Sequence, residues 1–209
     1  AISSYAREEG FAKQILLGQL ELFQDILGPD ISVTTTNSWR IARAGKPQDN
    51  TGYHRDIELG QSAWELGLWF PMVDLGEGGA LRVMSGSHTM PREKFPFHKT
   101  SHPTIKPGSD LNKLGFMYAP PKYERWFVDQ MTPVPMSVGQ GLMFFAPMMH
   151  GQEINSGPTT RWSTDFNIAN SYAPLDWVHH GDQAKYEFVS ESATMKIGRM
   201  FHDFPVLSG

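Results

Sequence analysis

The sequence predicts a mainly β domain, namely a double-stranded β-helix (jelly roll) with an N-terminal helix and a long lid-like insertion. After one helical segment, the apolar residues fall into many short β-rich runs, and these runs are separated by turns that contain Gly and Pro. Many short strands around one core are typical of sandwiches and jelly rolls. The length of 209 residues is sufficient for one domain with a substantial core, and we expect residues 1–209 to form a single domain.

The composition excludes several classes of protein. The apolar fraction of 40% and the charged fraction of 19% are those of an ordinary globular protein, and a net charge of −4 gives no reason to expect a nucleic-acid partner. No apolar stretch approaches the roughly 18–20 residues of a membrane span, and no export signal is evident, so we expect no membrane partner and a cytoplasmic location. Cysteine is absent, so any metal must be held by His, Asp or Glu.

The first 30 residues are predicted to form one amphipathic helix from Ser4 to Leu27. Ser3 or Ser4 can cap its start, and Gly28-Pro29 ends it. The apolar residues that recur at close to the helical period are Phe11, Ile15, Leu16, Leu20, Phe23 and Leu27.

The jelly-roll core is predicted to span residues 31–175, with the lid at about 88–138, and residues 176–209 are expected to form a C-terminal extension. In the lid, basic residues outnumber acidic ones, which fits either a solvated loop or a lid that faces an anion. The predicted strands are 31–44 (one strand or a hairpin), 51–59, 63–75, 80–84, 141–146 and 160–171.

A metal site is predicted at His54-Arg55-Asp56. Alternate residues of a strand point to one face, so the imidazole and the carboxylate can converge on one ion. A third ligand from a distant strand would complete a 2-His-1-carboxylate triad, which leaves coordination positions open. A second match to the same pattern, His180-Gly181-Asp182, could use His202 as its third ligand, but no arginine follows His202.

The residues downstream of the first motif favour it over the second. An apolar strand precedes His150, and Arg161 follows His150 by eleven positions (161 minus 150). A guanidinium matches the two oxygens of a carboxylate, and Ser163, on the same strand face as Arg161, can donate a hydrogen bond to the same group.

These segments resemble the phytanoyl-CoA dioxygenase family of Fe(II)/2-oxoglutarate-dependent oxygenases. The resemblance covers roughly residues 50–170 and is carried by Tyr53-His54-Arg55-Asp56, by the run from Ala80 to the Gly86-Ser87-His88 turn, and by His150 with Arg161. It implies that His54, Asp56 and His150 hold Fe(II), that Arg161 binds the distal carboxylate of 2-oxoglutarate, and that Trp69 lines the co-substrate pocket.

One position departs from the family pattern. Relatives often carry Ser or Thr two residues after the distal His, where this chain has Gln152, so Ser163, Thr159 or the Gln152 amide would take over that contact. An aspartate at position 56, where related halogenases have Gly or Ala, implies hydroxylation with O₂ rather than halogenation.

The substrate is expected to be a small molecule, and the basic lid favours one with an anionic group. Trp39, Arg40 and Arg43 could face the pocket or could simply pack or lie at the surface. Two alternatives remain at this point. One is a cupin-like metal enzyme that does not use 2-oxoglutarate, with Glu58 as an added ligand, and the other is a jelly-roll binding module without catalysis.

Overall fold

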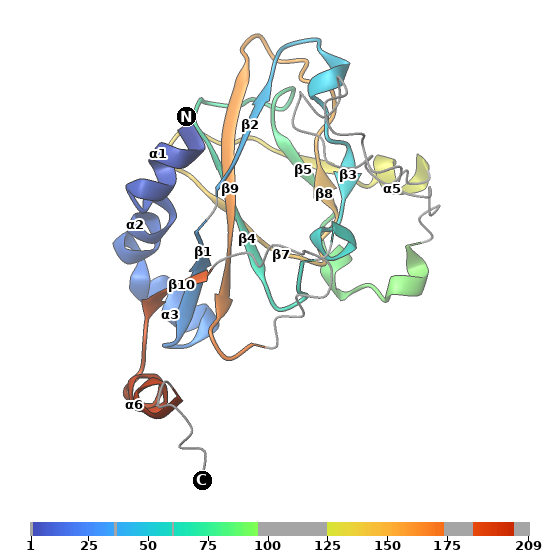
Figure 1. Ribbon diagram of the computed structural model, residues 1–209. Coiled ribbons are helices and arrows are strands. Elements are labelled where there is room, and N and C mark those ends of the chain that lie inside the picture. Colours follow the sequence, from blue (N-terminus) through green and yellow to red (C-terminus); the bar gives the residue numbers. More distant parts are fainter. Residues whose placement is uncertain (1, 36, 60, 96–124, 174–185, 203–209) are drawn as a thin grey trace, which may run out of the picture.

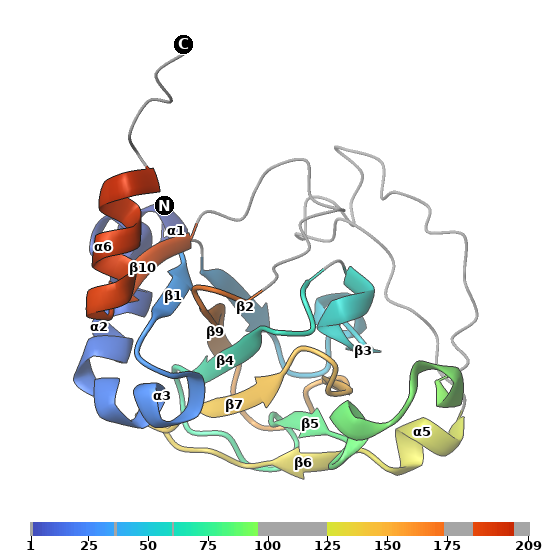
Figure 2. The same ribbon diagram turned by 90° about the horizontal axis from the view of Figure 1, so that it is seen from below.

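The computed structural model describes residues 2–35, 37–59, 61–95, 125–173 and 186–202. Two antiparallel sheets face each other, and helices α1–α3 cover the outer face of the larger sheet (Figures 1 and 2). This architecture confirms the predicted jelly roll. The strand order is β10-β1-β9-β4-β7 in the larger sheet, with β2 also paired to β9, and β3-β8-β5-β6 in the smaller one.

The larger sheet is built around β9, its longest described strand (Arg161–Asn170). Its first half pairs with β2 and its last residues pair with β1, so these two strands do not form the hairpin considered for residues 31–44. The remaining strands of this sheet are β1 (Ile31–Thr34), β2 (Ser38–Ala42), β4 (Leu66–Pro71), β7 (Leu142–Phe145) and β10 (Tyr186–Ser190). Strand β10 lies within the predicted C-terminal extension and pairs with β1.

The smaller sheet consists of short strands, two of which contain only two residues. Strand β8 crosses the middle of this sheet, between β3 and β5. Neither β6 nor β8 was among the predicted strands, because β6 falls inside the predicted lid and β8 is too short for any periodicity to show. The strands are β3 (Tyr53–His54), β5 (Leu81–Val83), β6 (Thr132–Val134) and β8 (His150–Gly151).

The predicted single N-terminal helix is wrong, since three short helices occupy this segment. They are α1 (Ile2–Glu8), α2 (Phe11–Gly18) and α3 (Leu20–Leu27). Gly10 adopts a left-handed conformation (φ 62°), which ends the first helix, and Gln19 leaves helical geometry between the other two. Ser3 and Ser4 lie inside α1 and not before its first residue, whereas the predicted end at Gly28 is confirmed. The apolar stripe survives the breaks, because Leu16 and Phe23 pack into the core against the larger sheet.

Both ends of the predicted lid are folded, which corrects its boundaries, and residues 96–124 lie outside the described part of the chain. Phe95 and Phe127 stack with their ring centroids 5.2 Å apart and form a buried cluster with Met149. Helix α5 (Arg125–Asp129) and strand β6 therefore belong to the core. Phe127 of α5 is buried and Val134 of β6 is partly buried against the core, whereas Trp126 is exposed. The neighbouring Pro, Lys and His residues hid this burial in the sequence.

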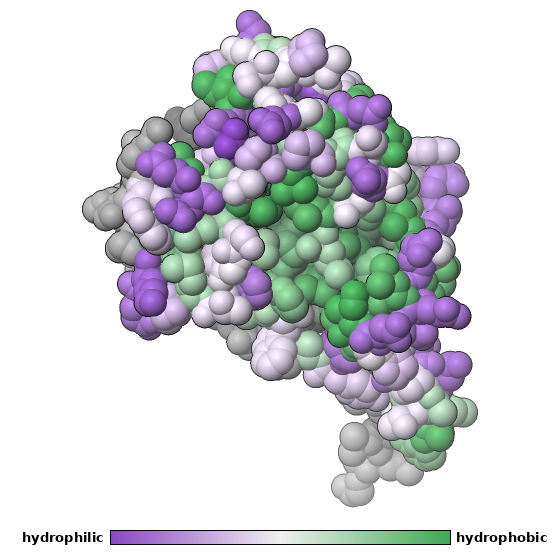
Figure 3. Space-filling view, turned by 180° about the vertical axis from the view of Figure 1, so that it is seen from behind, coloured by the Kyte–Doolittle hydropathy of each residue, from purple (hydrophilic) through white to green (hydrophobic). Residues whose placement is uncertain are grey.

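A further helix, α6 (Ala193–His202), projects from the body of the molecule (Figures 1 and 3). Met195 is buried, whereas Ile197, Met200 and Phe201 are exposed. On the face opposite to that of Figure 1, hydrophobic side chains gather in a central area with hydrophilic ones around it (Figure 3). Every helix in the described part of the chain is too short or too polar to cross a lipid bilayer.

Candidate metal centre and its cavity

The structure brings His54, Asp56 and His150 together between the two sheets. His54 of β3 lies directly opposite His150 of β8 in the antiparallel register, so the third ligand comes from a neighbouring strand. Asp56 does not continue β3 as predicted but begins a 3-10 helix (Asp56–Leu59). The carbonyl oxygen of Ala146 accepts hydrogen bonds from the N–H groups of Asp56 and Ile57, and these bonds turn the chain after β3. The carboxylate is therefore placed by a turn, not by strand alternation.

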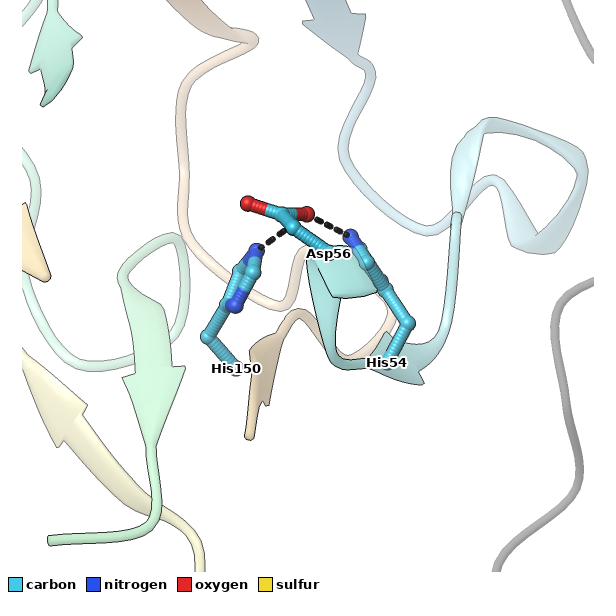
Figure 4. A group of neighbouring side chains, drawn as sticks. All are labelled: His54, Asp56 and His150. Atoms are coloured by element: carbon cyan, nitrogen blue, oxygen red, sulfur yellow. Dashed lines mark ion pairs between the residues drawn. The ribbon is translucent and has the colours of Figure 1, made fainter. Parts of the chain in front are cut away.

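The three side chains point their ligand atoms at one another (Figure 4). Asp56 Oδ1 lies 3.5 Å from His54 Nε2 and 3.6 Å from His150 Nε2, and the potential ligand atoms all lie within 4.8 Å of one another. Ligand atoms at about 2.1 Å from one ion lie roughly 3.0–3.4 Å apart. The group therefore needs only a small contraction to hold a metal ion.

Backbone carbonyls select the tautomer of both imidazoles. Nδ1 of His54 lies 3.4 Å from the Gly52 oxygen, and Nδ1 of His150 lies 3.0 Å from the Met148 oxygen. A carbonyl can only accept, so each Nδ1 carries the hydrogen and each Nε2 presents its lone pair to the centre. This is the arrangement that a metal-binding histidine requires.

Burial sets the charge state of the ligands. It lowers the pKa of His54 to about 3, with help from the neighbouring His150. Burial also raises the pKa of Asp56, while His150 and Arg40 act in the opposite direction. His54 is thus neutral at physiological pH, which is the form that coordinates a cation.

Arg55, between the two ligands of the motif, anchors this turn from the other side. It is almost completely buried, donates two hydrogen bonds to Glu58 Oε1 (2.8 and 2.6 Å), and lies 4.1 Å from the ring centroid of Phe95. Glu58 is therefore engaged by Arg55 and does not belong to the ligand group, contrary to the cupin-like alternative.

The Gly86-Ser87-His88 turn positions the strand that carries His150. The fully buried Ser87 hydroxyl accepts a hydrogen bond from Met149 N–H at 2.8 Å, and the Met149 carbonyl accepts one from Met84 N–H. His88 stacks on Phe145 and is not part of the metal group, by which we mean His54, Asp56 and His150. This agrees with a structural role for the turn.

Gly151 allows β8 to approach β3 at the metal centre. A Cβ atom at this position would lie 2.3 Å from the Gly52 carbonyl oxygen and 2.7 Å from Tyr53 Cα. We expect Gly151→Ala to lower the free energy of unfolding by about 2 kcal/mol or more, and to weaken metal binding, because the two histidine strands must separate. Urea unfolding and Co(II) titration would measure these effects. Gly139→Ala is the matched control, since Gly139 has a positive φ of 90° but nothing within 4 Å; equal losses in both variants would contradict the close-approach argument.

The metal group opens into a cavity of about 170 Å³ between the sheets, and three of the four predicted co-substrate residues line it. These three are Trp69, Gln152 and Arg161. The Gln152 amide nitrogen donates a hydrogen bond to the Asp49 carbonyl oxygen (2.9 Å), so this nitrogen is already engaged. Ser163 is fully buried on the same face of β9 as Arg161, and its hydroxyl has no hydrogen-bond partner within the described structure.

Arg161 has the environment of a side chain that awaits an anion. It is buried, and its Nε lacks a hydrogen-bond partner among the described residues. Within the described part of the chain, its guanidinium donates one long hydrogen bond, from Nη1 to the Gly79 carbonyl oxygen at 3.5 Å. Burial, assisted by the charge of Arg40, lowers its pKa to about 10, so it remains a cation at neutral pH. A buried guanidinium without an acidic partner is costly unless a ligand supplies one.

Two further charged residues line the cavity, Arg40 of β2 and Asp165 of β9. The sequence leaves open whether Arg40 faces the pocket or the surface, and the sequence analysis gives Asp165 no role. A signal was available for Asp165, because Arg161, Ser163 and Asp165 alternate along one strand and so share a face.

The second His-x-Asp motif, His180-Gly181-Asp182, lies outside the described part of the structure, and so does the side chain of His202.

The Asp165 carboxyl is held in the cavity at a cost to stability. Burial raises its pKa from 3.8 to about 6, against the opposing effect of Arg40. For an acid whose pKa is higher in the folded protein, the cost is full above pH 6 and disappears as the pH falls below the unfolded value of 3.8.

In metal-free protein, Asp165→Asn is therefore expected to raise the free energy of unfolding by about 3 kcal/mol at pH 7.5 and by about half as much at pH 5. Urea unfolding at both pH values measures the difference. Asp25→Asn, on the exposed side of α3, is the control and should change little at either pH. A gain for Asp165→Asn that does not depend on pH would mean that packing, not charge, is responsible.

Comparison with known proteins agrees with this geometry. The family model for phytanoyl-CoA dioxygenase (PhyH) matches residues 9–163, which is more than half of the chain. The chain belongs to the phytanoyl-CoA dioxygenase family. The resemblance drawn from the His-x-Asp, Gly-Ser-His and His-Arg segments is thereby confirmed. No curated protein sequence matches this chain significantly.

Solved structures of similar fold include several non-haem enzymes. The apo form of the non-heme monooxygenase ThoJ matches with a TM-score of 0.56 at 17% identity, over 84% of this chain and 58% of that one. The non-heme alpha ketoglutarate dependent carbocyclase SnoK from nogalamycin biosynthesis gives 0.51 at 19%, over 74% and 56%. EctD from S. alaskensis, in its apo form, gives 0.50 at 13%, over 77% and 53%. The chain thus spans less than three fifths of the length of these structures.

Proposed function

We propose that this member of the phytanoyl-CoA dioxygenase family is an Fe(II)- and 2-oxoglutarate-dependent oxygenase. In the proposed reaction a C–H bond of a small molecule is hydroxylated with O₂ while 2-oxoglutarate is converted to succinate and CO₂. The observation that carries the proposal is one cavity lined by His54, Asp56 and His150 and by Arg161, whose Nε has no hydrogen-bond partner among the described residues. Two neutral imidazoles and one carboxylate suit iron(II), and a guanidinium suits the far end of a dicarboxylate.

In the proposed enzyme, His54, Asp56 and His150 hold the iron, and the carbonyls of Gly52 and Met148 fix the imidazole orientation. O₂ would supply the oxidising power for C–H cleavage, with iron(II) to activate it and 2-oxoglutarate as the second reductant. Arg161 would bind the distal carboxylate, and Ser163, two residues further along β9, would donate its hydroxyl hydrogen to the same group.

Trp69 of β4 contributes a wall to the proposed co-substrate site. It is 4% exposed and lies directly opposite Asp165 in the sheet register. The indole thus closes the larger-sheet side of the cavity. An apolar wall beside the charged groups strengthens their electrostatic interactions and excludes water from the reacting centre.

Neither alternative has an observation in its favour. A cupin-like enzyme would gain a ligand from Glu58, which is occupied by Arg55. A binding module without catalysis leaves unexplained why a buried Arg161 without an ion pair among the described residues shares a cavity with three side chains that could hold a metal ion.

The test is the consumption of 2-oxoglutarate. Wild-type protein with Fe(II), ascorbate and O₂ should form succinate slowly even without a primary substrate, and EDTA should stop this. The matched variants are His54→Ala, which should be inactive, and His88→Ala, which removes a histidine from outside the metal group and should retain activity. Tight iron binding without succinate formation would refute the proposal in favour of a cupin-like enzyme, and a protein that binds no metal would favour the binding module.

A further inference from the structure

Arg40 and Asp165 carry opposite charges and line the cavity, but neither has a role in the proposed binding of iron or 2-oxoglutarate. Both line the same cavity as the three potential metal ligands. In the β2–β9 register, Ser38 lies opposite Asp165 and Arg40 lies opposite Ser163. Since directly opposed residues share a face, Arg40 is the diagonal neighbour of both Asp165 and Arg161. The three charged side chains therefore line one cavity, in which Arg161 is buried, Asp165 is half-buried and Arg40 is exposed.

The two opposite charges do not neutralise each other by contact. Across the described residues, no ion pair within 4.0 Å involves Arg40 or Asp165. Asp165 interacts with the hydroxyl of Ser38, and Arg40 affects it only through space. The guanidinium of Arg40 and the carboxylate of Asp165 thus both remain available to groups of a ligand that enters the cavity.

The position of Arg40 indicates a second anion site. Arg40 and Arg161 are like charges in one cavity, and the charge of Arg40 contributes to the lowered pKa of Arg161. Two guanidinium groups that line one cavity can each bind a carboxylate, and Arg40 is the more exposed of the two. If Arg161 takes the distal carboxylate of 2-oxoglutarate, the carboxylate for Arg40 must come from another molecule.

The carboxyl of Asp165 has a position for a cation beside it. Among the described residues no Lys, Arg or His nitrogen lies within 4.0 Å of this half-buried carboxylate, and desolvation raises its pKa. A buried group that is kept at such a cost, inside a cleft, is a candidate for ligand recognition. An ammonium group of a ligand would supply the missing positive charge and donate charge-assisted hydrogen bonds.

Charge balance in the filled site supports the same class of ligand. Iron(II), doubly ionised 2-oxoglutarate, Asp56 and Arg161 together carry no net charge, and Arg40 and Asp165 cancel each other. A substrate that carries one positive and one negative group preserves neutrality, whereas a simple anion leaves an excess negative charge in a largely enclosed site.

We propose that Arg40 and Asp165 form the primary-substrate subsite and that the substrate is a compact zwitterion of the amino-acid type. Arg40 binds its carboxylate and Asp165 binds its ammonium group, which places the rest of the molecule beside the metal group. This inference rests on the proposed oxygenase function and names the substrate class for it.

The experiment uses three sets of small probes with the intact protein. The sets are the common L-α-amino acids, their methyl esters, which lack the carboxylate, and the corresponding 2-hydroxy acids, which lack the ammonium group. Binding is measured by calorimetry to protein loaded with Ni(II) and 2-oxoglutarate, and stimulation of succinate formation is measured with Fe(II). We expect at least one amino acid to bind and to stimulate succinate formation, and its ester and hydroxy acid to bind at least about tenfold more weakly.

The variants assign the two ends of the ligand. Arg40→Gln should weaken amino-acid binding at least about tenfold while changing the KM for 2-oxoglutarate far less than Arg161→Ala does. Asp165→Asn should remove the preference for the amino acid over its hydroxy acid. Arg7→Gln, in the exposed part of α1, is the control and should bind as the wild type does.

Three outcomes would overturn the inference. They are no binding by any amino acid, equal binding of the amino acid and its hydroxy acid by the wild type, and an equal rise in the KM for 2-oxoglutarate in Arg40→Gln and Arg161→Ala. In each case, iron-dependent succinate formation without any probe would leave the oxygenase function intact. Its absence would instead refute that function itself.

Discussion

Asp56→Ala should lower the affinity for Fe(II) by more than about 100-fold and abolish the consumption of 2-oxoglutarate. Changes to groups that only orient a metal ligand already cost about 10–100-fold in affinity, and Asp56 is the only anionic member of the group. The protein should remain folded, because removal of a buried carboxyl with a raised pKa relieves a cost. Anaerobic calorimetry with Fe(II) and urea unfolding of the metal-free protein measure the two effects.

The iron-binding measurement on Asp56→Ala needs a chloride-free buffer and a control variant. Chloride must be left out, since related halogenases hold chloride where the carboxylate is missing. Asp25→Ala, on the exposed side of α3, is the matched control and should bind iron as the wild type does. Retention of iron affinity and turnover in Asp56→Ala would remove this residue from the metal centre.

Arg161→Ala is expected to raise the KM for 2-oxoglutarate by about 30-fold to several thousand-fold, which corresponds to about 2–5 kcal/mol for a buried charge that loses its partner. The loss should be confined to the co-substrate, so the affinity for Fe(II) should change little. Arg161→Lys should recover only part of the loss, because an ammonium lacks the planar fork of donors. Steady-state kinetics with varied 2-oxoglutarate measure the effect. An unchanged KM in Arg161→Ala would mean that another cation of the cavity, with Arg40 the first candidate, holds the co-substrate.

The sequence was sufficient to predict the fold class and the convergence of His54, Asp56 and His150. Strand-forming runs punctuated by Gly and Pro predict a jelly roll whatever their partners are. The order of His54, Asp56, His150 and Arg161 along the chain carries the family pattern. Both features are local or depend only on spacing along the chain, so they can be predicted without knowing which strands pair or in what register.

The parts that failed depend on tertiary contacts. A continuous apolar period from Phe11 to Leu27 did not reveal that Gly10 and Gln19 interrupt the helix, because the stripe packs on the sheet across the breaks. The turn that places Asp56 depends on the carbonyl of Ala146, which is ninety positions away (146 minus 56). Pairing at such a distance cannot be read from periodicity.

Of the two further charged residues of the cavity, Asp165 could be placed from the sequence and Arg40 could not. Alternation along β9 would have placed Asp165 on the face of Arg161. The position of Arg40 needed the β2–β9 register, which sets it opposite Ser163. Arg40 can thus be assigned to the cavity only when the strand that pairs with β2 is known. From the sequence alone it looks like any surface arginine.

The most direct test of the central claim is an anaerobic titration of metal-free protein with Fe(II) and then 2-oxoglutarate. It is followed by the visible charge-transfer absorption that a keto acid chelated to iron(II) gives. We expect the absorption to appear and saturate at one equivalent in the wild type, to be absent in His150→Ala, and to require much more 2-oxoglutarate in Arg161→Ala. If the wild type binds iron and shows no such absorption at any concentration of 2-oxoglutarate, the assignment of this cavity as a 2-oxoglutarate oxygenase site is wrong.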